Sequence, residues 1–201
     1  MYKHLIALAL LASPAYSAGL EIDIAGEANG TIVIDLFEDV APLHVAQITA
    51  IAETGAYDNV VFHRVIDGFM AQTGDVQNGV MGSDMTRAGT GGSDLGNIPA
   101  EFSDLPFERG VVGMARSQNP DSANSQFFIV FYPRFSLDRN YTNFGRVIAG
   151  MDAVDAIARG EPPANPTRIL QASIAADGKP QRMAAPTAPI SASITPLNLG
   201  D

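Results

Sequence analysis

Hydrophobic and polar residues alternate near the start of the chain in a way that predicts a β-hairpin. The alternation runs over residues 20–24, is interrupted by Asn29-Gly30, and resumes over residues 31–37. A period of two is typical of half-buried strands, and Asn-Gly is a strong signal for a tight hairpin turn. Residues 42–52 then change to helical spacing, with a proline at the start and a glycine soon after the end. We therefore expect a hairpin followed by an α-helix.

The rest of the chain adds short apolar runs that are typical of strands. A second, short helix is predicted over residues 151–157, and the glycine-rich residues 74–96 are predicted to form a long loop. Further strands are predicted over residues 60–65, 69–72, 110–115, 125–131, 144–148 and 167–175. Seven or eight strands with two helices and mostly short connections favour a closed or nearly closed antiparallel barrel over a doubly wound α/β sheet.

The two ends of the chain differ in composition from the segment between them. Residues 1–17 combine a short basic start, an apolar stretch too short to span a bilayer, and small residues typical of a cleavage site. We interpret them as a secretory signal peptide, the alternative being a hydrophobic tail on a cytosolic protein. Residues 177–201 are rich in Ala, Pro, Ser and Thr and are interpreted as a flexible tail. This leaves one domain at residues 18–176 and predicts a periplasmic or secreted location.

Composition argues against several classes of function. A formal net charge of −10 repels phosphate backbones, so we expect no nucleic-acid partner and no stable membrane insertion or docking on anionic lipid. The absence of cysteine removes disulfides, thiolate metal sites and cysteine nucleophiles. The three histidines are scattered, so no histidine-based metal site is expected. A nucleotide- or sugar-binding barrel has only the glycine run at residues 89–92 in its favour, and that run lacks the Gly-Lys-Ser/Thr of a phosphate-binding loop.

Three blocks of sequence carry a resemblance to a known family. The first is FHRVIDGFMAQTGD at residues 62–75, the second is GMAR at 113–116 followed by NSQFFI at 124–129, and the third spans residues 137–147. In order and spacing they resemble the cyclophilin-type peptidyl-prolyl cis-trans isomerases, bacterial and exported members in particular. The agreement extends from about residue 19 to about residue 176.

The resemblance implies a fold and an activity. The family's fold is a closed eight-stranded antiparallel barrel capped by two α-helices, and its activity is rotation about Xaa-Pro peptide bonds without cofactor or metal. The expected partners are proline-containing peptides and unfolded exported proteins. A different possibility stays open, namely a non-catalytic chaperone that binds proline peptides on the same barrel. No long amphipathic seam is visible, so a monomer is expected.

Arg64 is the expected catalytic residue. Rotation about a peptide bond transfers no proton, so the reaction needs no general base; it gains from any contact that is stronger in the twisted state. Arg64 carries a permanent positive charge and can donate to the prolyl nitrogen as that nitrogen loses its conjugation. Neighbouring residues of a strand point to opposite faces, so by resemblance Arg64 faces the groove and His63 the structural side. A surface arginine paired with a nearby Asp is the alternative.

The resemblance also implies the substrate-binding residues. Four apolar side chains would hold the proline ring, two glutamines would hold the substrate backbone, and Ala115 and Arg116 would offer their main chain. The full set is Phe69, Met70, Gln72, Ala115, Arg116, Gln126, Phe128, Leu137 and Tyr141. Taken without the family, the apolar members are equally compatible with an ordinary core, and the glutamines with an exposed surface.

Three positions depart from the family pattern. Ser136 stands where many members carry a tryptophan, and this difference implies weak cyclosporin binding. Tyr141 stands where a histidine often lines the pocket, but it keeps a ring face and a donor, so we expect activity to be retained. Thr73 replaces a glycine at the end of a predicted strand, which is a small change.

Overall fold

A computed structural model describes residues 19–175, so the predicted signal peptide at 1–17 and the predicted tail at 177–201 lie outside the described residues. The strands are β1 (Gly19–Ala25), β2 (Gly30–Leu36), β3 (Arg64–Ile66), β4 (Met70–Thr73), β5 (Val111–Met114), β6 (Phe127–Val130), β7 (Asn143–Ala149) and β8 (Arg168–Ala175). The helices are α1 (Pro42–Glu53) and α2 (Met151–Asp155), together with the short 3-10 helices η1 (Met85–Arg87), η2 (Pro120–Ser122) and η3 (Phe135–Leu137).

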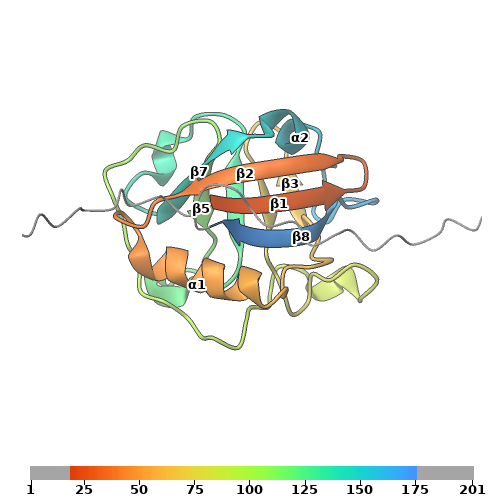
Figure 1. Cartoon of the computed structure of the whole chain (residues 1–201), viewed down its shortest axis with the longest axis horizontal. Coiled ribbons are helices and arrows are strands. Elements are labelled where there is room, and N and C mark those ends of the chain that lie inside the picture. The colour runs from red at the N-terminus through yellow and green to blue at the C-terminus, as the bar shows by residue number, and fades with distance from the viewer. Residues whose placement is uncertain (1–18, 176–201) are drawn as a thin grey trace, which may run out of the picture.

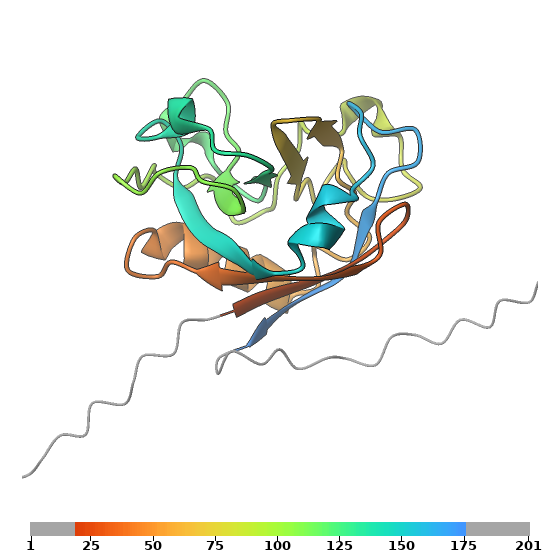
Figure 2. The same cartoon turned by 90° about the horizontal axis from the view of Figure 1, so that it is seen from above.

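The eight strands form one antiparallel sheet in the order β3-β4-β6-β5-β7-β2-β1-β8. Figure 1 shows β1, β2 and β8 side by side, with α1 lying along this part of the sheet. Figure 2 shows that the sheet curls strongly, so that β7 and β8 rise on either side of β1 and β2. The prediction of a mostly β fold with eight antiparallel strands and two helices is confirmed.

Full closure of the barrel is not confirmed. The end strands of the sheet are β3 and β8, and the contact between their two sides is an isolated bridge from Val61 to Arg168. The amide of Ile169 donates to the carbonyl of Val60 at 2.8 Å and the amide of Phe62 to the carbonyl of Thr167 at 2.9 Å to form this bridge. The amide of Asn59 also donates to the carbonyl of Ile169 at 2.8 Å. The strand predicted over residues 60–65 starts only at Arg64, because Val60 and Val61 bridge to different segments and form no continuous ladder. The sheet is therefore a curled half-barrel.

The main core fills the inside of the curled sheet. Ile22, Ile32 and Ile34 of the hairpin are fully buried there, as the period of two predicts. On α1 the apolar stripe contributes Ile48 and Ile51, which pack into the same core. The helix has no side-chain cap at Ala41 and depends on tertiary contacts at its start.

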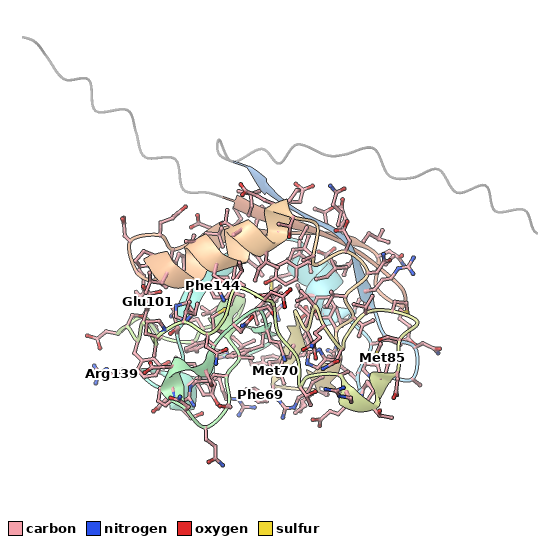
Figure 3. The ribbon with its side chains drawn as sticks, turned by 90° about the horizontal axis from the view of Figure 1, so that it is seen from below. Phe69, Met70, Met85, Glu101, Arg139 and Phe144 are labelled. Carbon is pink, nitrogen blue, oxygen red and sulfur yellow. The ribbon has the colours of Figure 1, made fainter. Side chains whose placement is uncertain are left out.

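Glu101 supplies the missing cap of α1 from the loop that precedes β5. Its carboxylate accepts hydrogen bonds from the amides of Leu43 at 3.1 Å and His44 at 3.0 Å. It also lies 2.6 Å from His44 Nδ1. A carboxylate can only accept here, so Nδ1 carries the proton and Nε2 is left buried with no partner among residues 19–175. Figure 3 shows Glu101 at this end of α1.

A second apolar cluster lies on the other face of the strands β4 and β6. Phe127 and Ile129 of β6 belong to the main core, whereas Phe128 and Val130 belong to the second cluster. On β4 the split is the same, since Ala71 packs into the main core and Met70 into the second cluster. These strands are therefore apolar on both faces, and the second face is available to line a binding site.

Candidate functional site

Arg64 occupies the start of β3, where alternation separates it from the core. Val65 is buried in the main core, and the side chain of Arg64 is 40% exposed on the opposite face. Arg64 pairs directly with Gln72 of β4, and Gln72 pairs with Phe128 of β6. Three strands thus carry a cation, an amide and an aromatic ring in one row across the sheet.

This row opens into a cavity of about 240 Å³, which we call the Arg64 cavity. Nine of the ten predicted site residues line this cavity, namely Arg64, Phe69, Met70, Gln72, Ala115, Arg116, Phe128, Leu137 and Tyr141. Figure 3 shows Phe69 and Met70 together on the side of the domain away from α1, while Phe144 lies closer to that helix. The tenth residue, Gln126, lines an adjoining cavity instead.

Aromatic rings support the apolar wall of the Arg64 cavity. Phe128 is buried and stacks on Phe107 at a centroid distance of 5.9 Å, and Tyr141 meets it edge-on at 5.8 Å. A Cβ at Gly113 would lie 2.6 Å from Phe128 Cζ and 2.7 Å from Phe107 Cε1, so only glycine leaves room for this stack. Sequence reasoning assigned no role to either residue: Phe107 lies outside the motif blocks, and Gly113 opens the GMAR block but carries no side chain.

Two arginines lie on aromatic rings at the rim of the cavity. The Arg134 guanidinium lies 4.8 Å from the ring centroid of Phe69, and that of Arg116 lies 4.5 Å from the ring centroid of Tyr141. Arg116 also donates to the carbonyls of Asn140 and Ser117, at 2.7 and 2.9 Å. The side chain of Arg116 is therefore held at the rim of the cavity. This is in addition to the main-chain role that the resemblance implies for Arg116.

The two predicted glutamines contact each other. Gln72 Nε2 donates to Gln126 Oε1 at 2.9 Å, and Gln126 Nε2 donates to the carbonyl of Gly91 at 2.8 Å. The amide of Ala115 is taken by the carbonyl of Gln126 at 2.9 Å. Gln126 thus connects the sheet to the loop at residues 74–96. Both glutamines, with Ala115, face the adjoining cavity of about 460 Å³, which we call the polar cavity.

The loop at residues 74–96 is held by two polar side chains that sequence reasoning did not assign. The buried carboxylate of Asp75 accepts from the amides of Gln77, Asn78, Gly89 and Gly91. Asn124 accepts from the amide and hydroxyl of Ser93 and donates to the carbonyl of Gly96 at 2.7 Å. Both residues belong to the motif blocks given above, so their place in those blocks was the sequence feature that could have identified them.

His63 is buried and does not line the Arg64 cavity. Neither of its ring nitrogens has a hydrogen-bond partner within the described part of the chain. Burial lowers the pKa of His63, and burial likewise lowers the pKa of His44 against the opposing effect of Glu101. Both rings therefore favour the neutral form in the folded protein.

Stability should fall as the pH drops through the range in which free histidine titrates. The unfolded chain binds protons at these histidines with an ordinary pKa of about 6.5, and the folded chain binds them only at lower pH. The unfolded protein therefore takes up more protons below that pH. For each histidine, the free energy of unfolding falls by at most about 1.4 kcal/mol per unit of pH. Urea unfolding between about pH 7.5 and about pH 5.5 measures the slope. His44→Gln and His63→Gln should each reduce it, and a flat profile for the unchanged protein would contradict the expectation.

The chemistry available at this site is positioning and electrostatics. An apolar wall faces a cation that stays charged at any physiological pH, and amide groups lie beside it. Among residues 19–175, no group of three or more Asp, Glu or His side chains is arranged to hold a metal ion. No helix of that part of the chain has the length and apolar character needed to cross a bilayer.

Comparisons with known proteins place the chain in one family. The family model described as cyclophilin type peptidyl-prolyl cis-trans isomerase/CLD matches residues 20–174. A probable peptidyl-prolyl cis-trans isomerase of Brucella suis is 54% identical over 158 residues, covering 75% of this chain and 81% of the relative.

Two solved structures have a similar fold. The crystal structure of a cyclophilin from Hirschia baltica superposes with a TM-score of 0.66 at 28% identity, covering 77% of this chain and 72% of that chain. A cyclophilin-type isomerase from Cryptosporidium parvum, crystallised in the presence of the dipeptide Ala-Pro, gives a TM-score of 0.66 at 26% identity. That match covers 78% of this chain and 98% of the other.

Proposed function

The chain belongs to the cyclophilin-type peptidyl-prolyl cis-trans isomerases and is an isomerase enzyme, and we propose that Arg64 carries its catalysis from the edge of the Arg64 cavity. In this proposal the proline ring of a substrate enters between the apolar side chains of the cavity. The guanidinium then donates a hydrogen bond to the prolyl nitrogen as the peptide bond twists.

The energetics of the reaction explain how such a donor accelerates it, with positioning of the proline ring in the apolar cavity supplying the rest. Resonance in the peptide bond creates a barrier of about 18–20 kcal/mol, and uncatalysed Xaa-Pro rotation takes tens to hundreds of seconds. Twisting removes the conjugation and leaves the nitrogen with a lone pair that accepts a hydrogen bond. A donor at that point binds the twisted state more tightly than the planar state, and only such a difference accelerates the reaction. Lowering the barrier by about 7 kcal/mol corresponds to about five powers of ten in rate.

The observation that carries the proposal is the position of Arg64 across from the aromatic wall. Its guanidinium and the ring of Phe128 line the same cavity, and Gln72 lies between them on β4. A ring seated against Phe128 has its nitrogen directed toward a fixed cation, while Gln72 is available to the flanking backbone. The Ala-Pro dipeptide present with the Cryptosporidium parvum relative supports proline-containing peptides as ligands.

The proposal is tested by measuring isomerisation and binding together on one proline-containing peptide. Exchange between cis and trans forms can be followed by NMR while binding is measured by calorimetry on the same peptide. Accelerated exchange supports the isomerase proposal. Binding without any acceleration would instead favour a chaperone that holds proline peptides on the same fold.

Cyclosporin is proposed to bind weakly. Ser136 is exposed in η3 next to Leu137, and it offers no ring to the rim of the Arg64 cavity. Phe135 is 63% exposed on the same short helix and is not among the residues that line the cavity. The aromatic surface that the family's tryptophan supplies in many members is therefore missing from this position.

We also propose that the enzyme is exported and acts on unfolded exported proteins in the periplasm or outside the cell. The support is the pattern of residues 1–17, a basic start followed by a short apolar stretch and small residues. Slow Xaa-Pro steps limit the folding of many chains, which gives an exported isomerase its substrates.

Export has a direct test at the N-terminus of the mature protein. Protein purified from the native cell should begin at Ala18 or Gly19, because cleavage is expected after Ser17 or one residue later. Edman sequencing or intact mass measures this directly. A chain that starts at Met1 or Tyr2 would overturn the proposal of export and leave the isomerase function untouched.

A further inference from the structure

The guanidinium of Arg64 is held by a carboxylate that is distant in sequence. Arg64 Nε donates to Glu161 Oε2 at 2.8 Å, across a separation of 97 residues. The side chains are 40% and 54% exposed, so solvent reaches both partners. Glu161 belongs to the segment between α2 and β8, which contains none of the motif blocks.

The backbone beside Glu161 is fastened to β3. The amide of Val65 donates to the carbonyl of Gly160 at 2.8 Å, and the amide of Gly160 donates to the carbonyl of Val65 at 2.9 Å. This reciprocal pair is an antiparallel bridge, and one further step of the same register brings Glu161 opposite Arg64. Gly160 has a φ of 143°, and a Cβ there would lie 2.6 Å from Pro163 Cα. The bridge to Val65 and the glycine at position 160 therefore place Glu161 opposite Arg64.

Glu161 approaches Arg64 from outside the Arg64 cavity. It lines a separate cavity of about 350 Å³, which also includes Arg64 and Gln72, and it does not line the Arg64 cavity. A guanidinium has five N–H donors, of which the Nε group carries one. The carboxylate takes that one donor, and the terminal nitrogens carry the four remaining N–H groups toward other acceptors.

We propose that Glu161 is a positioning residue for the isomerisation. It fixes the orientation of the Arg64 guanidinium before substrate arrives, so that less rotamer freedom is lost when the hydrogen bond to the twisting nitrogen forms. The inference rests on the proposed catalytic role of Arg64. Glu161 acts through Arg64 and does not touch the substrate.

The test compares Glu161→Ala and Glu161→Gln with a matched control. The control is Glu108→Gln, because Glu108 pairs with Arg146 at 3.0 Å with side chains 48% and 47% exposed, away from the Arg64 cavity. Removing a solvent-exposed pair should lower kcat/KM about three- to fivefold in Glu161→Ala, and less in Glu161→Gln, which keeps an acceptor. The loss should appear in kcat with KM unchanged, since Arg64 acts in the twisted state. Glu108→Gln should retain full activity.

A double-mutant cycle separates this inference from the proposed function. If Glu161 acts through Arg64, adding Glu161→Ala to Arg64→Ala should cause no further loss. Full activity of Arg64→Ala would overturn the proposed role of Arg64. The inference alone would be overturned if Arg64→Ala is impaired while Glu161→Ala is as active as Glu108→Gln. The same holds if Glu161→Ala is more active than the unchanged protein. Thermal unfolding of each variant monitors the fold, and Glu161→Gln carries the test if Glu161→Ala is unstable.

Discussion

Replacing Arg64 with alanine should lower kcat/KM for prolyl isomerisation by about 100- to 1000-fold, the usual cost of removing one preorganised donor from a transition state. The side chain is half-exposed at the edge of the Arg64 cavity, so its loss leaves no buried void. We therefore expect the thermal midpoint to stay close to that of the unchanged protein. The measurement is the rate of cis–trans exchange on a proline-containing peptide at several enzyme concentrations.

Two variants serve as controls for this result. Arg146→Ala removes an exposed arginine that pairs with Glu108 and lines no part of the Arg64 cavity, so it should retain full activity. Arg64→Lys keeps the charge but loses the planar fork, and it should recover only part of the rate. Equal rates for Arg64→Ala and the unchanged enzyme would refute the mechanism, and the apolar cavity would then have to account for catalysis without the guanidinium.

The neighbouring residues Phe127 and Phe128 should separate folding from function. Both are buried on β6, and truncating a buried phenylalanine to alanine costs about 3–5 kcal/mol of unfolding free energy. Phe127 packs edge-on with Tyr57 and Phe144 in the main core, whereas Phe128 lines the Arg64 cavity. Both variants should thus be destabilised to a similar degree, but only Phe128→Ala should lose most of its peptide binding and isomerase activity.

Urea unfolding and peptide titration at low temperature measure the two effects separately. If the alanine variants do not fold, Phe127→Leu and Phe128→Leu give the same contrast with a smaller loss of stability, since leucine fills more of each site than alanine does. An unchanged affinity in a folded Phe128→Ala variant would show that the proline ring does not bind against this wall. A comparable loss of affinity in Phe127→Ala would show that general loosening of the sheet explains both results.

Local patterns predicted the strands well, because burial on one face imposes a period of two. The hairpin of β1 and β2 and the stripe of α1 follow this rule directly. Closure of the barrel was beyond such reasoning, since it depends on how far the sheet curls and on single bridges such as Val61–Arg168. The start of β3 was placed too early for the same reason, because residues 60–62 are apolar yet form no continuous ladder.

The lining of the Arg64 cavity was predictable because it lies within contiguous motif blocks. Gln126 belongs to such a block, yet it faces the polar cavity and hydrogen-bonds to Gln72. The spacing of residues along the sequence does not predict this direction of its side chain. Phe107 and Glu161 come from segments with no motif, and only the fold brings them to Phe128 and Arg64. Long-range partners of this kind are set by topology, and a pattern along one segment carries no information about them.

The four hydrogen bonds that Asp75 accepts have a consequence for how the enzyme can diversify. Asp75 binds backbone amides, and every residue except proline carries one. The side chains of Gln77 and Asn78 can therefore be exchanged without altering the path of the loop, whereas Gly91 cannot, since a Cβ there would lie 2.5 Å from Asp75 Oδ1. Residues of this loop form part of the wall of the polar cavity. Of the four residues of this loop that line the polar cavity, Thr90 alone carries a side chain, so substitutions at Thr90 can change substrate preference while Asp75 and Asn124 hold the backbone in place.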